Sequence, residues 1–85
     1  MRAITGPEDV TTREDLAAFV SLLLEDCEAN ADEWQNSDLP SFLEAMAAWI
    51  QDMDRYYDAE RLDMEKLTPW RLIADILEAS RIYEA

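Results

Sequence analysis

The sequence predicts an all-α protein, a compact three-helix bundle with room for a fourth short helix in the connection 55–67. Three segments carry apolar residues at steps of three and four, each begins near a good helix-capping residue, and no stretch alternates with the two-residue period of a strand. With 49% hydrophobic residues, one glycine and three prolines, the composition is typical of a folded chain. The 85 residues suffice for one small domain, which we place at residues 11–85 behind an N-terminal extension, residues 1–10.

The first helix is expected to begin at Thr11 or Thr12 and to end at Asn30. Thr11 and Glu14 have the spacing of a capping box, in which the two side chains satisfy free backbone amides of the first turn. The apolar stripe of this helix consists of Leu16, Phe19, Val20, Leu23, Leu24 and Cys27. Trp34 lies in the tight connection that follows, and we expect it to fill the core from there.

The second helix is expected to begin near Asp38, with Pro40 in the first turn, where no intrahelical amide is lost. It has the clearest apolar stripe of the chain: Leu39, Phe42, Leu43, Met46, Trp49, Ile50 and Met53. The segment 55–67 is less regular, and residues 58–61 are where a short extra helix would open. Four of its residues are candidates to pack on the core: Tyr56, Tyr57, Leu62 and Leu67.

The third helix is predicted from Thr68 as N-cap and Pro69 at the first helical position. It carries two adjacent apolar stripes, Trp70, Ile73, Ala74 and Leu77 beside Leu72, Ile76, Ala79 and Tyr83. About half of the helix surface is therefore apolar, which predicts packing on two sides. Two pairs are expected on its polar side as ordinary surface ion pairs, Arg71 with Asp75 and Glu78 with Arg81.

Several of these residues form a pattern of core aromatics and turn residues: Trp34-x-Asn36, Leu39-x-x-Phe42-Leu43-x-Ala45-x-x-x-Trp49, Trp70 and Tyr83-Glu84. The pattern resembles a family of small acidic bacterial domains of uncharacterised function, and the resemblance extends from about Val10 to Glu84. It implies a soluble bacterial helical domain with no catalytic residue to transfer. Some small families of this kind accompany toxin genes as immunity proteins.

Charge is the strongest functional signal in the sequence. With 20 acidic and 7 basic residues, the formal net charge is −13, which argues against direct binding to the phosphates of nucleic acid. Eleven acids and no base lie between Arg13 and Arg55, and six of those acids fall between Glu25 and Asp38. We expect a persistent negative potential there that attracts a basic partner, unless the charge serves solubility alone.

The sequence contains no motif for catalysis, a cofactor or a metal. Without histidine and with one cysteine, it excludes a disulfide framework, a Cys/His zinc site and a histidine-based triad. Asp52-Met53-Asp54 begins like a calcium loop, but Tyr56 and Tyr57 occupy the fifth and sixth positions, where a ligand and a glycine are needed. A weak divalent site near Asp32, Glu33 and Asp38 would have no motif. Cys27 lies on an apolar stripe and is expected to be a small core residue.

These observations predict a protein-binding domain rather than an enzyme. Leu22 lies off the centre of the first helix's stripe, where it is either exposed to a partner or covered by another helix. The candidate partner-binding residues are Asp15, Leu22, Glu25, Asp26, Glu28, Asp32 and Glu33.

The most concrete function that we expect is that of an immunity-type or nucleic-acid-mimicking inhibitor, which covers the basic surface of a partner such as a nuclease. The alternative is a structural or assembly domain that forms a homodimer. The longest run of large apolar side chains, residues 22–24, is far too short to cross a bilayer, and a single cysteine fits a reducing compartment, so we expect a cytoplasmic protein.

Overall fold

The computed structural model describes residues 3–84, and the predicted all-α three-helix bundle is confirmed. Its three α-helices are α1 (Arg13–Asn30), α2 (Leu39–Ala59) and α3 (Pro69–Ser80). Three short 3-10 turns accompany them, η1 (Pro7–Asp9), η2 (Ala31–Glu33) and η3 (Met64–Lys66). No strand occurs within residues 3–84.

Each helix begins at a side chain that accepts a hydrogen bond from a free backbone N–H of the first turn. The distances are 3.1 Å from Asp15 N to Thr12 Oγ1, 3.0 Å from Ser41 N to Asp38 Oδ2 and 3.1 Å from Arg71 N to Thr68 Oγ1. The expected Thr11–Glu14 capping box is wrong by one residue. Because Thr12 is the N-cap, Asp15 occupies the third helical position, and its carboxylate accepts from Thr11 N at 3.0 Å.

The second helix is longer than the sequence suggested and includes residues 58–59, so the expected start of a short helix at 58–61 is wrong; the short helix of the connection 55–67 is η3. Tyr57 continues the buried face of α2 and is 1% exposed. Arg61 then adopts a left-handed conformation with φ 58°, and the N–H groups of Arg61 and Leu62 donate to the carbonyls of Asp58 and Tyr57. This is a Schellman motif, which ends the helix and leaves only the turn η3 in the connection.

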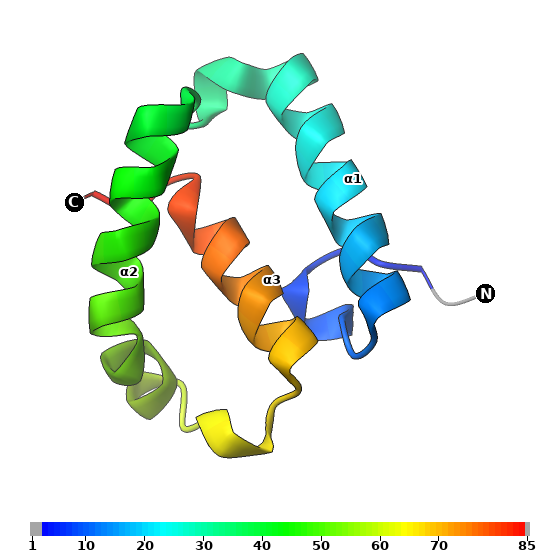
Figure 1. Ribbon diagram of the computed structural model, residues 1–85, viewed down its shortest axis with the longest axis vertical. Coiled ribbons are helices and arrows are strands. Elements are labelled where there is room, and N and C mark those ends of the chain that lie inside the picture. The colour runs from blue at the N-terminus through cyan, green and yellow to red at the C-terminus, as the bar shows by residue number, and fades with distance from the viewer. Residues whose placement is uncertain (1–2, 85) are drawn as a thin grey trace.

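The three helices lie in one layer, with α3 between α1 and α2 (Figure 1). The molecule measures 33 × 33 × 17 Å along its principal axes, so it is flat, with one dimension about half of the other two. The expectation that α3 packs on two sides is confirmed, since α1 and α2 contact its opposite flanks. The outer helices pack on α3 rather than on each other, which leaves the space between them uncovered by any helix of residues 3–84.

The core at the α1–α3 contact consists of Val10, Phe19 and Ala74, with Ile4, Leu16 and Trp70 packed around it. Val10 is 0% exposed, and η1 lies against α3. The described part of the segment expected as an N-terminal extension, residues 1–10, therefore belongs to the packed domain. On the α2 side the buried residues are Ala45, Trp49 and Tyr57, and Trp34 fills the core from the connection, as expected, at 9% exposed.

Six residues that the apolar stripes assigned to the core are instead exposed: Val20, Leu24, Leu39, Leu43, Ile50 and Ile73. Their exposed fractions range from 41% for Ile73 to 68% for Leu39. The prediction that they are buried is wrong. The outer helices do not face each other, so one edge of the stripe on α1 and on α2 has no helix to cover it; Ile73 lies on α3 and is 41% exposed although α3 contacts both outer helices.

Arg71 and Asp75 were expected as a surface pair, and this prediction is wrong. Asp75 is 7% exposed, and its carboxylate accepts from Arg71 Nε at 3.0 Å and from the Tyr57 hydroxyl at 2.5 Å. Burial and the neighbouring Asp75 carboxylate raise the pKa of Tyr57, so that its hydroxyl keeps the proton it donates. The hydrogen bond from Tyr57 to Asp75 is a buried polar link between the end of α2 and α3.

Candidate functional site

An open apolar groove lies between the two outer helices. Its walls are Val20 and Leu24 of α1 and Leu39 and Phe42 of α2, its floor includes Leu77 of α3, and Trp34 contributes at the η2 end. We call this feature the apolar groove; its volume is about 480 Å³. Ser37 and Asp38 supply the polar side chains of its lining among residues 3–84.

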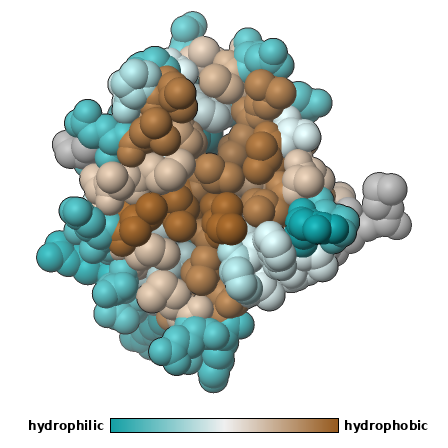
Figure 2. All heavy atoms as spheres, in the orientation of Figure 1, coloured by the Kyte–Doolittle hydropathy of each residue, from teal (hydrophilic) through white to brown (hydrophobic). Residues whose placement is uncertain are grey.

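The apolar groove belongs to a larger apolar face. Figure 2 shows hydrophobic residues that run across all three helices on the face of Figure 1, hollowed between the outer helices and bordered by hydrophilic residues. Leu43 and Ile50 extend it along α2, since they follow Leu39 on the same side of the helix at i+4 and i+11. Both are exposed. A face of this kind on a small protein is typical of an interaction surface.

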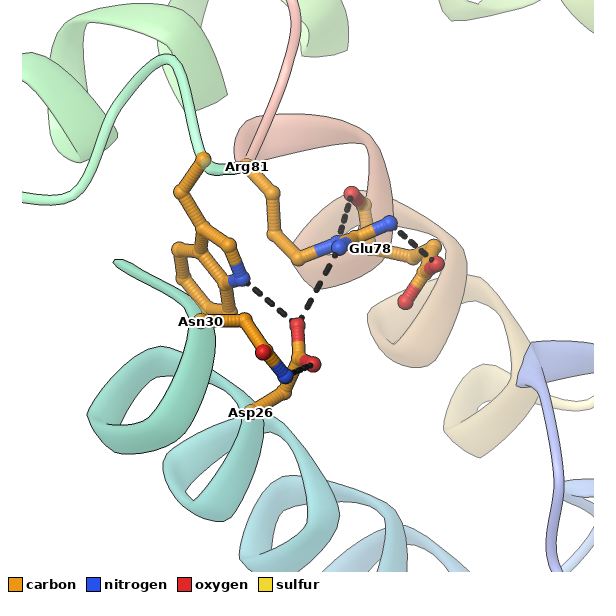
Figure 3. Close-up of polar contacts among 5 residues, drawn as sticks. Asp26, Asn30, Glu78 and Arg81 are labelled. Carbon is orange, nitrogen blue, oxygen red and sulfur yellow. Dashed lines mark hydrogen bonds and ion pairs between the residues drawn. The ribbon is translucent and has the colours of Figure 1, made fainter. Parts of the chain in front are cut away.

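A polar cluster fixes Trp34 and with it the end of the groove (Figure 3). We call it the Asp26 cluster; its members are Asp26, Asn30, Trp34, Glu78 and Arg81. The Asp26 carboxylate accepts from Trp34 Nε1 at 2.7 Å and from Asn30 Nδ2 at 2.9 Å. Arg81 Nη1 lies 3.4 Å from the same carboxylate, and its guanidinium lies 5.5 Å from the centre of the Trp34 ring. The cluster therefore ties the last turns of α1 to the end of α3.

Arg81 was expected on the exposed polar side of α3 but lies in the Asp26 cluster. Its side chain is only 21% exposed and also binds Glu78 at 2.8 Å, so Glu78–Arg81 is part of the Asp26 cluster rather than an isolated surface pair. The spacing of three residues between Glu78 and Arg81 is visible in the sequence, but the contacts with Asp26 and Trp34 join segments far apart in the chain. A solvated pair was therefore the wrong expectation.

Asn36 supports the same end of the molecule. Its side-chain amide donates to the carbonyl oxygens of Ser80 at 3.1 Å and Tyr83 at 2.8 Å, and its backbone N–H donates to the Arg81 carbonyl at 3.0 Å. These bonds satisfy carbonyls that the C-terminus of α3 would otherwise leave free. The contacts of Trp34 and Asn36 thus hold the η2–α2 connection against the C-terminal end of α3.

A family model matches residues 12–84, which include all three helices and every residue of the apolar groove. The chain belongs to DUF7660, a family of unknown function. No curated protein and no solved structure matches the chain. The DUF7660 match begins at the N-cap of α1 and so leaves out Val10, although this residue is buried in the core.

The candidate partner-binding residues of the DUF7660 chain do not form one surface. Glu25, Glu28, Asp32 and Glu33 are exposed around the end of α1 and η2, and we call them the acidic corner. Asp26 is half-buried in the Asp26 cluster. Asp15 caps the start of α1, about 15 Å from Glu25 along the helix axis. Leu22 is 41% exposed and, together with Asp26, lines a second hollow beside Ile4 and Thr5.

Sequence reasoning missed the groove because it assigned the groove residues to the core. A signal was present in the helix lengths: α1 and α2 have 18 and 21 residues, whereas α3 has 12. A third helix of that length cannot cover the apolar stripes of two longer ones. Cys27, expected in the core, is half-buried and lines the same groove.

Two further properties of the described chain concern metals and membranes. Within residues 3–84, no three side chains of histidine, cysteine, aspartate or glutamate come together as a metal site would require. No helix in this part of the chain is long and apolar enough to span a bilayer.

The Asp26 cluster predicts a pH dependence of stability in the acid range. The hydrogen bonds from Trp34 and Asn30, with the charge of Arg81, lower the pKa of Asp26 below its ordinary value. A lowered pKa stabilises the fold above the unfolded-state pKa, and this contribution is lost as the pH falls through the folded-state pKa. Wild type is therefore expected to be more stable than Asp26→Asn at pH 7, with the gap closing below about pH 4.

Urea unfolding of both proteins across this pH range measures the gap. Asp32→Asn serves as the control, because Asp32 is an exposed acid of the adjacent turn. A gap between wild type and Asp26→Asn that stays constant down to the lowest pH at which the proteins fold would contradict the role given to the ionised carboxylate.

Proposed function

We propose that this chain is a protein-binding domain that docks stoichiometrically on a basic partner and carries out no reaction. The observation that carries the proposal is the apolar groove, uncovered in a chain of net charge −13. Exposed leucines supply area that gains free energy when a partner buries it. The carboxylates near them select partners of opposite charge.

The acidic corner favours association for an electrostatic reason. The sequence places no base between Arg13 and Arg55, and Arg81, which approaches from α3, is already bound to Asp26 and Glu78. The carboxylates of Glu25, Glu28, Asp32 and Glu33 therefore act together on an approaching molecule. Such a field raises the association rate with a basic protein and weakens as the salt concentration rises.

In its most specific form, the proposal is that of an inhibitor. The domain would occlude the basic surface with which a nuclease binds its substrate, either as an immunity-type protein or as a mimic of nucleic acid. Its own charge disfavours direct binding to nucleic acid. The reducing bacterial cytoplasm is the compartment that suits the single half-buried Cys27.

A homodimer is the second candidate, and the same exposed leucines favour it. Two copies packed through this face would bury Leu24 and Leu39 from each chain. They would also bring two chains of net charge −13 together, which costs free energy at low salt. For this reason we prefer a basic partner.

The test is affinity capture from a bacterial lysate with the immobilised chain, followed by identification of the bound proteins and titration of the purified candidate. Wild type is compared with the charge reversal Glu25→Lys/Glu28→Lys/Glu33→Lys. The matched control is Glu44→Lys/Asp58→Lys/Glu60→Lys, which changes the net charge equally at exposed sites on α2 and its C-cap.

The proposal predicts a basic protein that binds one to one to wild type and to the control, and binds about tenfold or more weakly to the acidic-corner variant. Salt should release it. Equal weakening by both triple variants would mean that only net charge matters and would remove the site assignment. An affinity that does not change with salt would contradict the electrostatic part of the proposal.

A further inference from the structure

We infer that the apolar groove receives a single amphipathic α-helix of the partner, with leucine-like residues on one face and lysine or arginine along its borders. The inference deepens the proposed function. That the partner is basic rests on the proposed function, whereas the helical structure of its binding segment is argued from the groove alone. In the flat layer of Figure 1, this helix would lie over α3 between α1 and α2 as a fourth helix.

The walls of the groove have the form that a helix requires. Val20 and Leu24 of the α1 wall are spaced by four residues, and Leu39 of the α2 wall has the same spacing to Leu43, which continues the apolar face beyond the groove. Such pairs form the ridges against which another helix packs. Leu77 lies between the walls on α3. A helix that enters the groove therefore meets side-chain ridges on three sides, as in a four-helix bundle.

An extended peptide fits the groove poorly. A buried backbone must have its N–H and C=O groups paired, and the wall helices use their own backbone groups internally. The polar side chains of the described lining, Ser37 and Asp38, lie together at one end. Residues 3–84 contain no strand whose edge would pair with such a peptide. A helix brings its backbone hydrogen bonds with it and needs none from the groove.

Charge favours a basic helix over the other ligands that an apolar groove could bind, namely a second copy of the chain or a fatty acid. The Asp38 carboxylate lies in the lining and accepts from Ser41 N, and the hydrogen bonds from Ser41 lower the pKa of Asp38 and keep it ionised. Glu28 follows Leu24 by one helical turn, and Asp54 follows Ile50 in the same way. A second copy would place acids against acids, and a fatty acid would bring its own carboxylate. A helix with basic borders meets opposite charges instead.

The length of α3 sets the size of the ligand. Its 12 residues span about 18 Å, so a helix that covers it needs at least about the same number of residues. Apolar residues at i, i+3, i+4 and i+7 would provide the anchors. Basic residues belong at the end that lies over the acidic corner.

The test uses three synthetic peptides and isothermal titration calorimetry. The first is an amphipathic leucine–lysine helix of about 18 residues, the second has the same composition in an order without helical amphipathicity, and the third has glutamate in place of lysine. The protein variants are Leu24→Gln/Leu39→Gln in the groove, Leu22→Gln at the other hollow of α1 and Leu62→Gln in the α2–α3 connection. All four leucines are exposed, so we expect each variant to fold.

We expect the amphipathic lysine peptide to bind wild type, Leu22→Gln and Leu62→Gln alike, and the groove variant about tenfold or more weakly. The other two peptides should bind wild type about tenfold or more weakly than the first. Equal binding of the scrambled peptide, or no effect of the groove substitutions, would overturn the inference. The lysate capture decides separately on the proposed function, because it requires a basic partner but no helix.

The same variants also test whether the groove binds a fatty acid or a second copy of the chain. Saturable binding of laurate that the groove variant abolishes would assign the groove to an acyl chain. A dimer seen by light scattering in wild type and lost in the groove variant would assign it to a second copy. Either result would overturn the inference.

Discussion

Replacing Arg71 with methionine is expected to lower the free energy of unfolding by about 3 kcal/mol. Methionine keeps an apolar stem of similar length but leaves the Asp75 carboxylate, 7% exposed, with the Tyr57 hydroxyl and without its cation. A buried charge without a partner costs far more than the pair gains when intact. A chain of 85 residues has about 4–13 kcal/mol of stability in total, so the loss is large.

Urea unfolding measures this effect, with Arg55→Met as the matched control, because Arg55 is exposed on α2. The control should change stability by no more than about 0.5 kcal/mol. In Arg71→Met/Asp75→Asn, no charge is buried, and we expect about 1 kcal/mol or more of stability to return. A double variant no more stable than Arg71→Met would show that the loss does not come from an unpaired carboxylate.

Val10→Ala is expected to cost about 2 kcal/mol, which is the transfer free energy of the lost methyl groups plus a cavity. Val10 is 0% exposed against Phe19 and Ala74, although it precedes α1 and lies outside the residues that the family model matches. The effect would show that the segment before α1 is part of the cooperative fold.

The chain offers a matched control in its other valine, Val20, which is 44% exposed on α1. Val20→Ala should leave stability unchanged or raise it by a few tenths of a kcal/mol, since alanine has the higher helix propensity. Similar unfolding curves for the two variants would contradict the burial of Val10 in the folded protein.

Local features of this fold were predictable because they depend on neighbouring residues. Asp38 and Thr68 each accept a hydrogen bond from the third residue after them, and α1 ends at Asn30 as expected. The end of α2 was not predictable, because the left-handed conformation falls on Arg61, a residue type that rarely adopts it. A glycine there would have been a signal.

Features that depend on distant residues could not be predicted. The spacing of Arg71 and Asp75 is the same in an exposed and in a buried pair, and only Tyr57, 18 residues away, distinguishes the two. In the same way, the periodicity of Leu24 and Leu39 identifies an apolar face but not the helix that covers it. The sequence therefore predicted the acidic residues of the candidate site. The apolar groove beside them became visible only in the structure, where the three helices lie in one layer.

Leu24 and Leu39 line an open groove in the isolated chain, where they are 60% and 68% exposed. The most direct measurement is urea unfolding of Leu24→Gln/Leu39→Gln and wild type at several protein concentrations. An open groove predicts free energies of unfolding that agree within about 1 kcal/mol, with midpoints independent of concentration. A loss of more than about 3 kcal/mol would mean that both leucines are buried in solution, which would contradict an open groove.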